Sequence, residues 1–151
     1  MNAATQTSSV HVKWDGDHRF DAGRPGGPTV RLDGDGTTGQ SPVDALMSAL
    51  AACTAVDVVE ILAKRRTPLS ALSIDALGTR ADGVPRRVVD AKLTYTLSGD
   101  GIERSHAERA VELAITKYCS VRDSLNADIP IHFQVNLNGD VGQMKQAVSA
   151  S

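Results

Sequence analysis

The chain has 151 residues, which is enough for one domain with its own hydrophobic core and too few for two domains of ordinary size. Hydrophobic residues make up 41% and charged residues 23%, as in an ordinary soluble globular protein. A net charge of −2 and an aromatic content of 3% argue against a surface for nucleic acid or for an anionic membrane, because such surfaces need clustered cations or stacking rings.

Both ends of the chain are predicted to be tails. Residues 1–9 are small and polar, with neither the basic start nor the apolar run of a signal peptide, so we expect a disordered segment there. Residues 10–138 are predicted to form the single domain, and residues 139–151 a polar C-terminal tail. Without an export signal the expected location is the cytoplasm, where a disulfide between the two cysteines would be transient or catalytic.

Three short strands are predicted before the first helix, at residues 10–14, 18–22 and 29–33. The loop that follows the third strand contains the GxGxxG pattern of dinucleotide-binding proteins. The third strand has only Val30 and Leu32 as apolar residues, however, and lacks the continuous apolar run of a central parallel strand. We therefore expect no nucleotide and no other cofactor at this loop.

A long helix is predicted next, with Ser41 as its N-cap, Pro42 as its first helical residue and Asp44 as an acid three residues after the cap. It should end near residue 65, which gives a length of roughly 35 Å. Residues 45–63 are rich in alanine and apolar on nearly all sides, and a chain this short has difficulty covering them alone. Two acidic residues within this stretch argue against a membrane span. The pattern predicts a buried helix in a dimer.

The second half of the chain predicts the rest of an α+β fold. Two strands are expected at residues 72–79 and 88–97, followed by a helix capped by Ser105 and Glu108. The chain should then kink at residues 119–120 into a short third helix capped by Ser120. A last strand is expected at residues 129–137. The order is βββ-α-ββ-αα-β, with antiparallel strands packed around the long central helix.

The two cysteines are the residues most open to a chemical role. Cys53 lies in the middle of the long helix among apolar residues, where nothing local stabilises a thiolate and Asp57 on the next turn disfavours one. Cys119 lies just before the short third helix. Taken alone, these positions suit either reactive thiols or small packing residues. The histidines show no ligand spacing, so no metal site is expected.

Residues 41–62 and the segments 109–113 and 117–121 resemble the OsmC/Ohr family of osmotically inducible and organic hydroperoxide resistance proteins. More narrowly, the chain is similar to the OsmC-like branch, which has a DVVxIL motif after the first cysteine and KYCSV at the second. The resemblance extends over roughly residues 10–138. It implies an OsmC-like fold in an intertwined homodimer with active sites at the subunit interface, which agrees with the poorly covered central helix.

The resemblance also implies a reaction. Cys53 would be the peroxidatic cysteine, which an organic hydroperoxide oxidises to a sulfenic acid. Cys119 would resolve that acid as a disulfide, and a lipoyl-type dithiol would reduce the disulfide. The family's activating arginine corresponds to Arg31, with Arg19 and Arg24 as reserves on less certain segments.

Two positions depart from the pattern of the peroxidases. The family glutamate that fixes the arginine is replaced by Val43, and the proline after the second cysteine is replaced by Ser120. Asp44 is adjacent to the glutamate position, but it lies about 180° round the helix and roughly 13 Å along it from Cys53. Asp44 could therefore serve a cysteine only across the dimer, and its role as an acid at the helix start is sufficient without that.

Two interpretations of the protein's function other than a peroxidase remain open. One is a thiol-bearing small-molecule-binding protein in a stress response, with little or no turnover, and the other is a purely structural dimer. The position of Arg31 relative to Cys53 separates the first two: a guanidinium within hydrogen-bond reach favours catalysis, and an apolar pocket without it favours binding.

Overall fold

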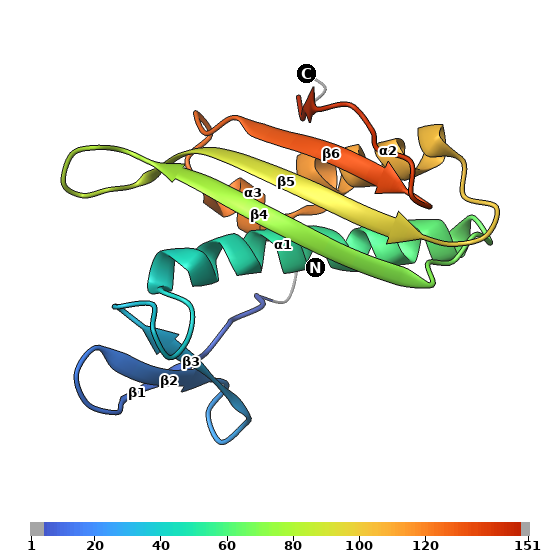
Figure 1. Cartoon of the computed structure of the whole chain (residues 1–151). Coiled ribbons are helices and arrows are strands. Elements are labelled where there is room, and N and C mark those ends of the chain that lie inside the picture. Colours follow the sequence, from blue (N-terminus) through green and yellow to red (C-terminus); the bar gives the residue numbers. More distant parts are fainter. Residues whose placement is uncertain (1–4, 149–151) are drawn as a thin grey trace. The chain divides into compact units, whose positions relative to one another are not determined.

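The computed structural model describes residues 5–148, whose elements follow in the order β1 β2 β3 α1 β4 β5 α2 η1 α3 β6 β7 (Figure 1). This order confirms the predicted α+β arrangement and adds a π-helical turn, η1, and a short last strand. The chain divides into two units, Met1–Leu46 and Met47–Ser151, whose boundary falls inside α1 (Pro42–Lys64). The predicted tails lie partly outside the described residues; residues 5–9 contain no helix or strand.

The N-terminal unit holds a three-stranded antiparallel sheet. Its strands are β1 (His11–Trp14), β2 (Arg19–Gly23) and β3 (Thr29–Asp33), paired in that order. The turn between β1 and β2 passes through Gly16 at φ 80°, a left-handed conformation that glycine adopts without steric cost. All three strands appear within one residue of their predicted bounds, because alternation and turn residues are local signals.

The start of α1 also follows from the sequence alone. The backbone N–H of Asp44 donates to Oγ of Ser41 at 3.1 Å, and the backbone N–H of Ser41 donates to Oδ2 of Asp44 at 3.0 Å. These reciprocal bonds form a capping box, which satisfies two donors that a helix start leaves unpaired. The predicted cap is confirmed, and α1 ends one residue before the expected end.

The C-terminal unit holds a four-stranded sheet in the order β4-β5-β6-β7, with the bounds β4 (Ala71–Arg80), β5 (Val88–Ser98), β6 (Ile131–Leu137) and β7 (Lys145–Gln146). The β4–β5 pair is antiparallel, as predicted, and the β6–β7 pair is antiparallel as well. The β5–β6 pair is parallel, because the helical segment between these strands returns the chain to the same end of the sheet. Strand β7 lies in a segment for which only a polar tail was expected.

Only one face of this sheet is covered, since buried and more exposed residues alternate along β5 and β6. Helix α1 packs on the covered face: a Cβ added to Gly78 of β4 would lie 2.8 Å from the Met47 sulfur, so the Met47 side chain would have to move to admit a larger residue. The fully buried core residues include Leu50, Val58 and Leu62 of α1, Leu93, Tyr95 and Leu97 of β5, and Ala107, Ala110 and Val111 of α2. By length and composition α1 could cross a membrane, and six of its residues are buried within the protein.

The segment between β5 and β6 contains α2 (Arg104–Leu113), η1 (Ala114–Tyr118) and α3 (Ser120–Ser124). The predicted kink at residues 119–120 is present. The predicted caps are wrong, because α2 begins at Arg104, before Ser105, and the cap of α3 is Cys119 and not Ser120. The Cys119 backbone is extended, and its sulfur accepts a hydrogen bond from the backbone N–H of Arg122 at 3.2 Å.

Candidate active site

The C-terminal unit brings the two cysteines together, although they come from distant parts of the chain. Cys53 is half-buried in the middle of α1, and Cys119 is 4% exposed at the start of α3. Neither forms a disulfide, and Cys53 lies close enough to Cys119 to raise its pKa. Two neighbouring thiols can form a disulfide without a large movement of the backbone.

The surroundings of Cys119 favour its protonated form. Burial raises the pKa of Cys119 to about 11, and the neighbouring Cys53 adds to this rise, whereas the backbone N–H groups of Arg122 and Val121 oppose it. At neutral pH such a thiol is ionised in about one molecule in 10⁴. Because the thiolate is the nucleophile, Cys119 is poorly suited to attack a substrate first and better suited to act after Cys53.

A buried pair of hydroxyl groups lies beside the thiols. The phenol of Tyr95 on β5 is fully buried and lies 2.7 Å from Oγ1 of Thr54, the residue after Cys53. The Thr54 hydroxyl donates in turn to the carbonyl of Ala51 at 2.9 Å, so Tyr95 is the donor of the first bond. Burial raises the pKa of Tyr95, as does the nearby Cys119, so the phenol stays neutral. This contact was not predicted from the sequence.

A pocket of about 380 Å³ opens next to Cys119. Its walls come from η1, α3 and the residues that follow α3, together with one residue of the C-terminal segment. Cys119 lines this pocket, whereas Cys53 is not among the described residues that do. The two sulfur atoms are therefore neighbours, but only one of them belongs to the pocket wall.

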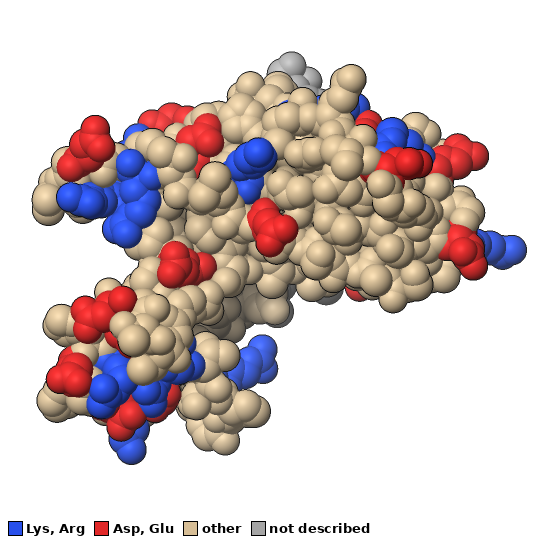
Figure 2. Space-filling model, viewed as in Figure 1, with Lys and Arg blue, Asp and Glu red and all other residues tan. Residues whose placement is uncertain are grey.

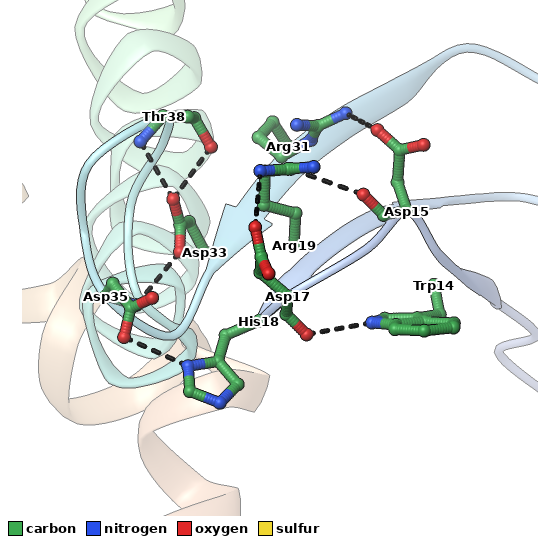
Figure 3. A network of polar contacts seen from close by, with 9 residues as sticks. All are labelled: Trp14, Asp15, Asp17, His18, Arg19, Arg31, Asp33, Asp35 and Thr38. Carbon is green, nitrogen blue, oxygen red and sulfur yellow. Dashed lines mark hydrogen bonds and ion pairs between the residues drawn. The ribbon is translucent and has the colours of Figure 1, made fainter.

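Arg31, the predicted activating arginine, lies in the N-terminal unit on β3. Its Nε donates to Oδ1 of Asp21 at 2.9 Å, and its Nη2 donates to Oδ2 of Asp21 at 3.2 Å. Nη2 also donates to Asp15 at 2.7 Å (Figure 3). The side-chain hydrogen bond from Arg31 lowers the pKa of Asp21. Two carboxylates thus fix the guanidinium, although the family's glutamate is absent. Because the cysteines belong to the other unit, a role for Arg31 at Cys53 stays a prediction.

Asp44 is placed by its capping box with Ser41, as described above, and a role across a dimer stays a prediction for it as well. The cap explains why an acid stands at this position, because a carboxylate in the first turn of a helix is stabilised by the free N–H groups there. Nothing in the capping box itself requires a catalytic function.

In the GxGxxG loop, the carboxylate of Asp33 binds other residues of the same loop. Asp33 accepts hydrogen bonds from the backbone N–H of Asp35 at 2.9 Å and from both the backbone N–H and the hydroxyl of Thr38, at 2.9 and 2.8 Å (Figure 3). These bonds hold the pKa of Asp33 at about 2. A phosphate group would compete with a fixed carboxylate for the same N–H groups, so the loop does not have the free donors of a phosphate-binding site.

Among residues 5–148, no group of three His, Cys, Asp or Glu side chains is placed to hold a metal ion. His18 and His132 instead pair with single carboxylates, Asp35 at 3.0 Å and Asp90 at 3.1 Å. On the visible face, acidic and basic side chains are intermixed and form no large patch of one sign (Figure 2).

Comparisons with known proteins agree with this fold. The family model of OsmC-like proteins matches residues 34–134. Protein YhfA of Escherichia coli K12 is 31% identical over 113 residues, which cover 74% of this chain and 84% of YhfA. The crystal structure of an OsmC-like protein from Mycoplasma pneumoniae aligns with a TM-score of 0.75 at 15% identity, over 89% of this chain and 99% of that one. The organic hydroperoxide resistance protein OhrB of Bacillus subtilis aligns with a TM-score of 0.58 at 15% identity, over 89% of this chain and 100% of that one.

Proposed function

Because the chain belongs to the OsmC-like family, we propose that it is a cytoplasmic thiol-dependent peroxidase that reduces organic hydroperoxides. The proximity of the Cys53 and Cys119 thiols carries this proposal, since a two-cysteine peroxidase needs a second thiol near the first. The chain also shares its fold with a protein named for organic hydroperoxide resistance.

The proposed cycle has three steps. The Cys53 thiolate attacks an oxygen of the hydroperoxide, which breaks the O–O bond, gives a sulfenic acid at Cys53 and releases an alkoxide that takes up a proton as the alcohol. The Cys119 sulfur then attacks the sulfenic sulfur, which forms the Cys53–Cys119 disulfide and releases water. A lipoyl-type dithiol reduces this disulfide and leaves as a cyclic disulfide.

The order of the two cysteines follows from their surroundings. Cys53 is half-buried, whereas Cys119 is almost fully buried and has a raised pKa of about 11. The first step needs a thiolate that meets an external substrate, and Cys53 meets this requirement better. The second step is intramolecular, and proximity compensates there for a small thiolate fraction.

Stopped-flow oxidation of the reduced protein tests this proposal. We expect Cys53 to react at least about tenfold faster with cumene hydroperoxide than with hydrogen peroxide, a difference of about 1.4 kcal/mol in the barrier. Equal rates would argue against an organic substrate. If neither peroxide oxidises the protein, the thiol-bearing binding protein becomes the better description.

The same experiment has a second phase, in which the sulfenic acid becomes the disulfide. Its rate should rise about tenfold per pH unit above neutrality, because the Cys119 thiolate fraction grows until the pH approaches the Cys119 pKa of about 11. A Cys119→Ser variant, which has no resolving thiol, is the control and should lack this phase. A rate that does not change with pH would mean that the Cys119 thiolate is not the attacking form.

We further propose that the protein is a homodimer that uses the exposed side of α1. Apolar residues follow one another there at spacings of three and four, the pattern of a helix–helix seam: Ala49, Ala52, Val56, Val59 and Ala63. Val56 is 60% exposed and Val59 is 46% exposed in the single chain. A second copy of the same helix would bury this stripe, since Ala and Val allow two helices to approach closely.

Sedimentation analysis of a Val56→Glu, Val59→Glu variant tests the dimer. The wild-type protein should sediment as a dimer and the variant as a folded monomer, because a helix seam cannot bury two unpaired carboxylates. Val84→Glu is the matched control, since Val84 is 95% exposed but lies outside α1. A wild-type protein that is monomeric at all concentrations would disprove the dimer.

A further inference from the structure

The pocket beside Cys119 has the size and position of an entrance to that thiol. Its volume of about 380 Å³ is within the range of small-molecule sites. Cys119 is 4% exposed over its whole surface, so little of the side chain is open to solvent beyond the wall of this pocket. A reagent that reaches the Cys119 sulfur in the folded protein is therefore expected to come through the pocket.

The wall of the pocket combines fixed polar groups with short apolar side chains. The Arg122 guanidinium donates to the carbonyls of Asn126, Ala127 and Ile129, at 3.2, 3.4 and 3.0 Å, which holds the segment after α3 against the helix. Lys117 is a second cation of the wall, and its ammonium lies 5.3 Å from the ring of Tyr118. Asp123 adds one carboxylate to the two cations, and Leu125, Ala127 and Ala147 add apolar surface. This lining suits a small molecule with a methylene chain and no positive charge.

We propose that this pocket admits the thiol reductant, whose first sulfur attacks Cys119 and not Cys53 in the oxidised protein. This inference rests on the proposed function, because it assigns the entry point of the dithiol in the last step of that cycle. The reductant thiolate forms a bond to the Cys119 sulfur, the Cys53–Cys119 bond breaks, and Cys53 leaves as a thiolate. The second thiol of the reductant then attacks its own first sulfur and releases the Cys119 thiolate, which takes up a proton.

The choice of sulfur also follows from the leaving groups. Attack at Cys53 would expel Cys119, whose burial raises its pKa to about 11, and a thiol that holds its proton so strongly is a poor leaving group. Attack at Cys119 releases the Cys53 thiolate first, and Cys119 leaves only in the second step, where the displacing thiol is held on the same reductant molecule. Access and the first leaving group thus favour the same sulfur, so the hydroperoxide and the reductant would meet different cysteines.

Mapping a mixed disulfide tests the inference without any peroxide. The wild-type protein is oxidised with diamide, mixed briefly with the monothiol 2-mercaptoethanesulfonate, quenched with N-ethylmaleimide and analysed by peptide mass spectrometry. We expect the monothiol on Cys119 and the maleimide on Cys53. The reverse distribution, or a protein in which diamide forms no disulfide, would overturn the inference. A protein that consumes no hydroperoxide can still give the expected map, so the two proposals fail separately.

A variant that narrows the pocket gives a second test. Ala127 is an exposed residue of the pocket wall, and Ala127→Trp should slow reduction of the diamide-formed disulfide by dihydrolipoamide at least about tenfold. Oxidation of Cys53 by cumene hydroperoxide should be unchanged. Ala71→Trp, at an exposed position that does not line the pocket, is the matched control and should alter neither rate. An unchanged reduction rate in Ala127→Trp would mean that the reductant enters elsewhere.

Discussion

Replacing Cys53 with serine is expected to abolish the consumption of organic hydroperoxide, whereas Cys119→Ser should still react once and stop at the sulfenic acid. A serine hydroxyl is a far weaker nucleophile than a thiolate, so the first step has no substitute in Cys53→Ser. In Cys119→Ser the first step is intact, but no thiol remains to form the disulfide. Peroxide consumption measured with a dithiol reductant present, together with dimedone labelling of the sulfenic acid, separates the two variants.

The structure indicates that Cys119→Ser should fold. The Cys119 sulfur already accepts a hydrogen bond from the backbone N–H of Arg122 as the cap of α3, and serine is a preferred residue at that position. Thermal unfolding of each variant serves as the control. If both variants retain full turnover, the two cysteines are packing residues only.

The sequence was sufficient for features whose signals lie within a few residues of one another. Ser41 and Asp44 are three residues apart and bond to each other, so their pattern alone defines the start of α1. The same pattern at Ser105 and Glu108 gave a wrong helix cap, because the Glu108 carboxylate binds Arg104 and Lys145 instead. Lys145 lies far along the chain, and a local pattern cannot reveal that contact.

The contacts of the candidate site join residues far apart in the chain, and local sequence patterns did not predict them. The pairing of Cys53 with Cys119 was expected only from the family resemblance, because neither residue has a local signal for a reactive thiol. The contact between Thr54 and Tyr95 joins residues 41 positions apart, and such a contact follows from packing. A buried tyrosine on a strand facing the cysteine helix is a signal that would have justified asking where its hydroxyl donates.

Removing the Arg31 side chain is expected to slow the oxidation of Cys53 at least about tenfold, an effect of about 1.4 kcal/mol on the barrier. The physical reason is that a mid-helix thiolate needs a nearby cation, and Arg31 occupies the position of the family's activating arginine. Its guanidinium is already fixed by Asp21 and Asp15 in the N-terminal unit. Such a fixed cation can act on a thiolate with little loss of side-chain entropy.

The ultraviolet absorbance of the Cys53 thiolate, followed against pH in a Cys119→Ser background, measures this effect directly. In Arg31→Ala the titration should move to higher pH, because the thiolate loses its cation, while the dimer stays folded. Arg31→Lys should restore part of the effect, since it keeps the charge but not the paired hydrogen bonds to Asp21. Arg87→Ala is the control, because Arg87 also pairs with an aspartate, Asp128 at 3.1 Å, and is not a candidate for the activating arginine. An unchanged titration in Arg31→Ala would remove Arg31 from the mechanism and favour a binding protein over a peroxidase.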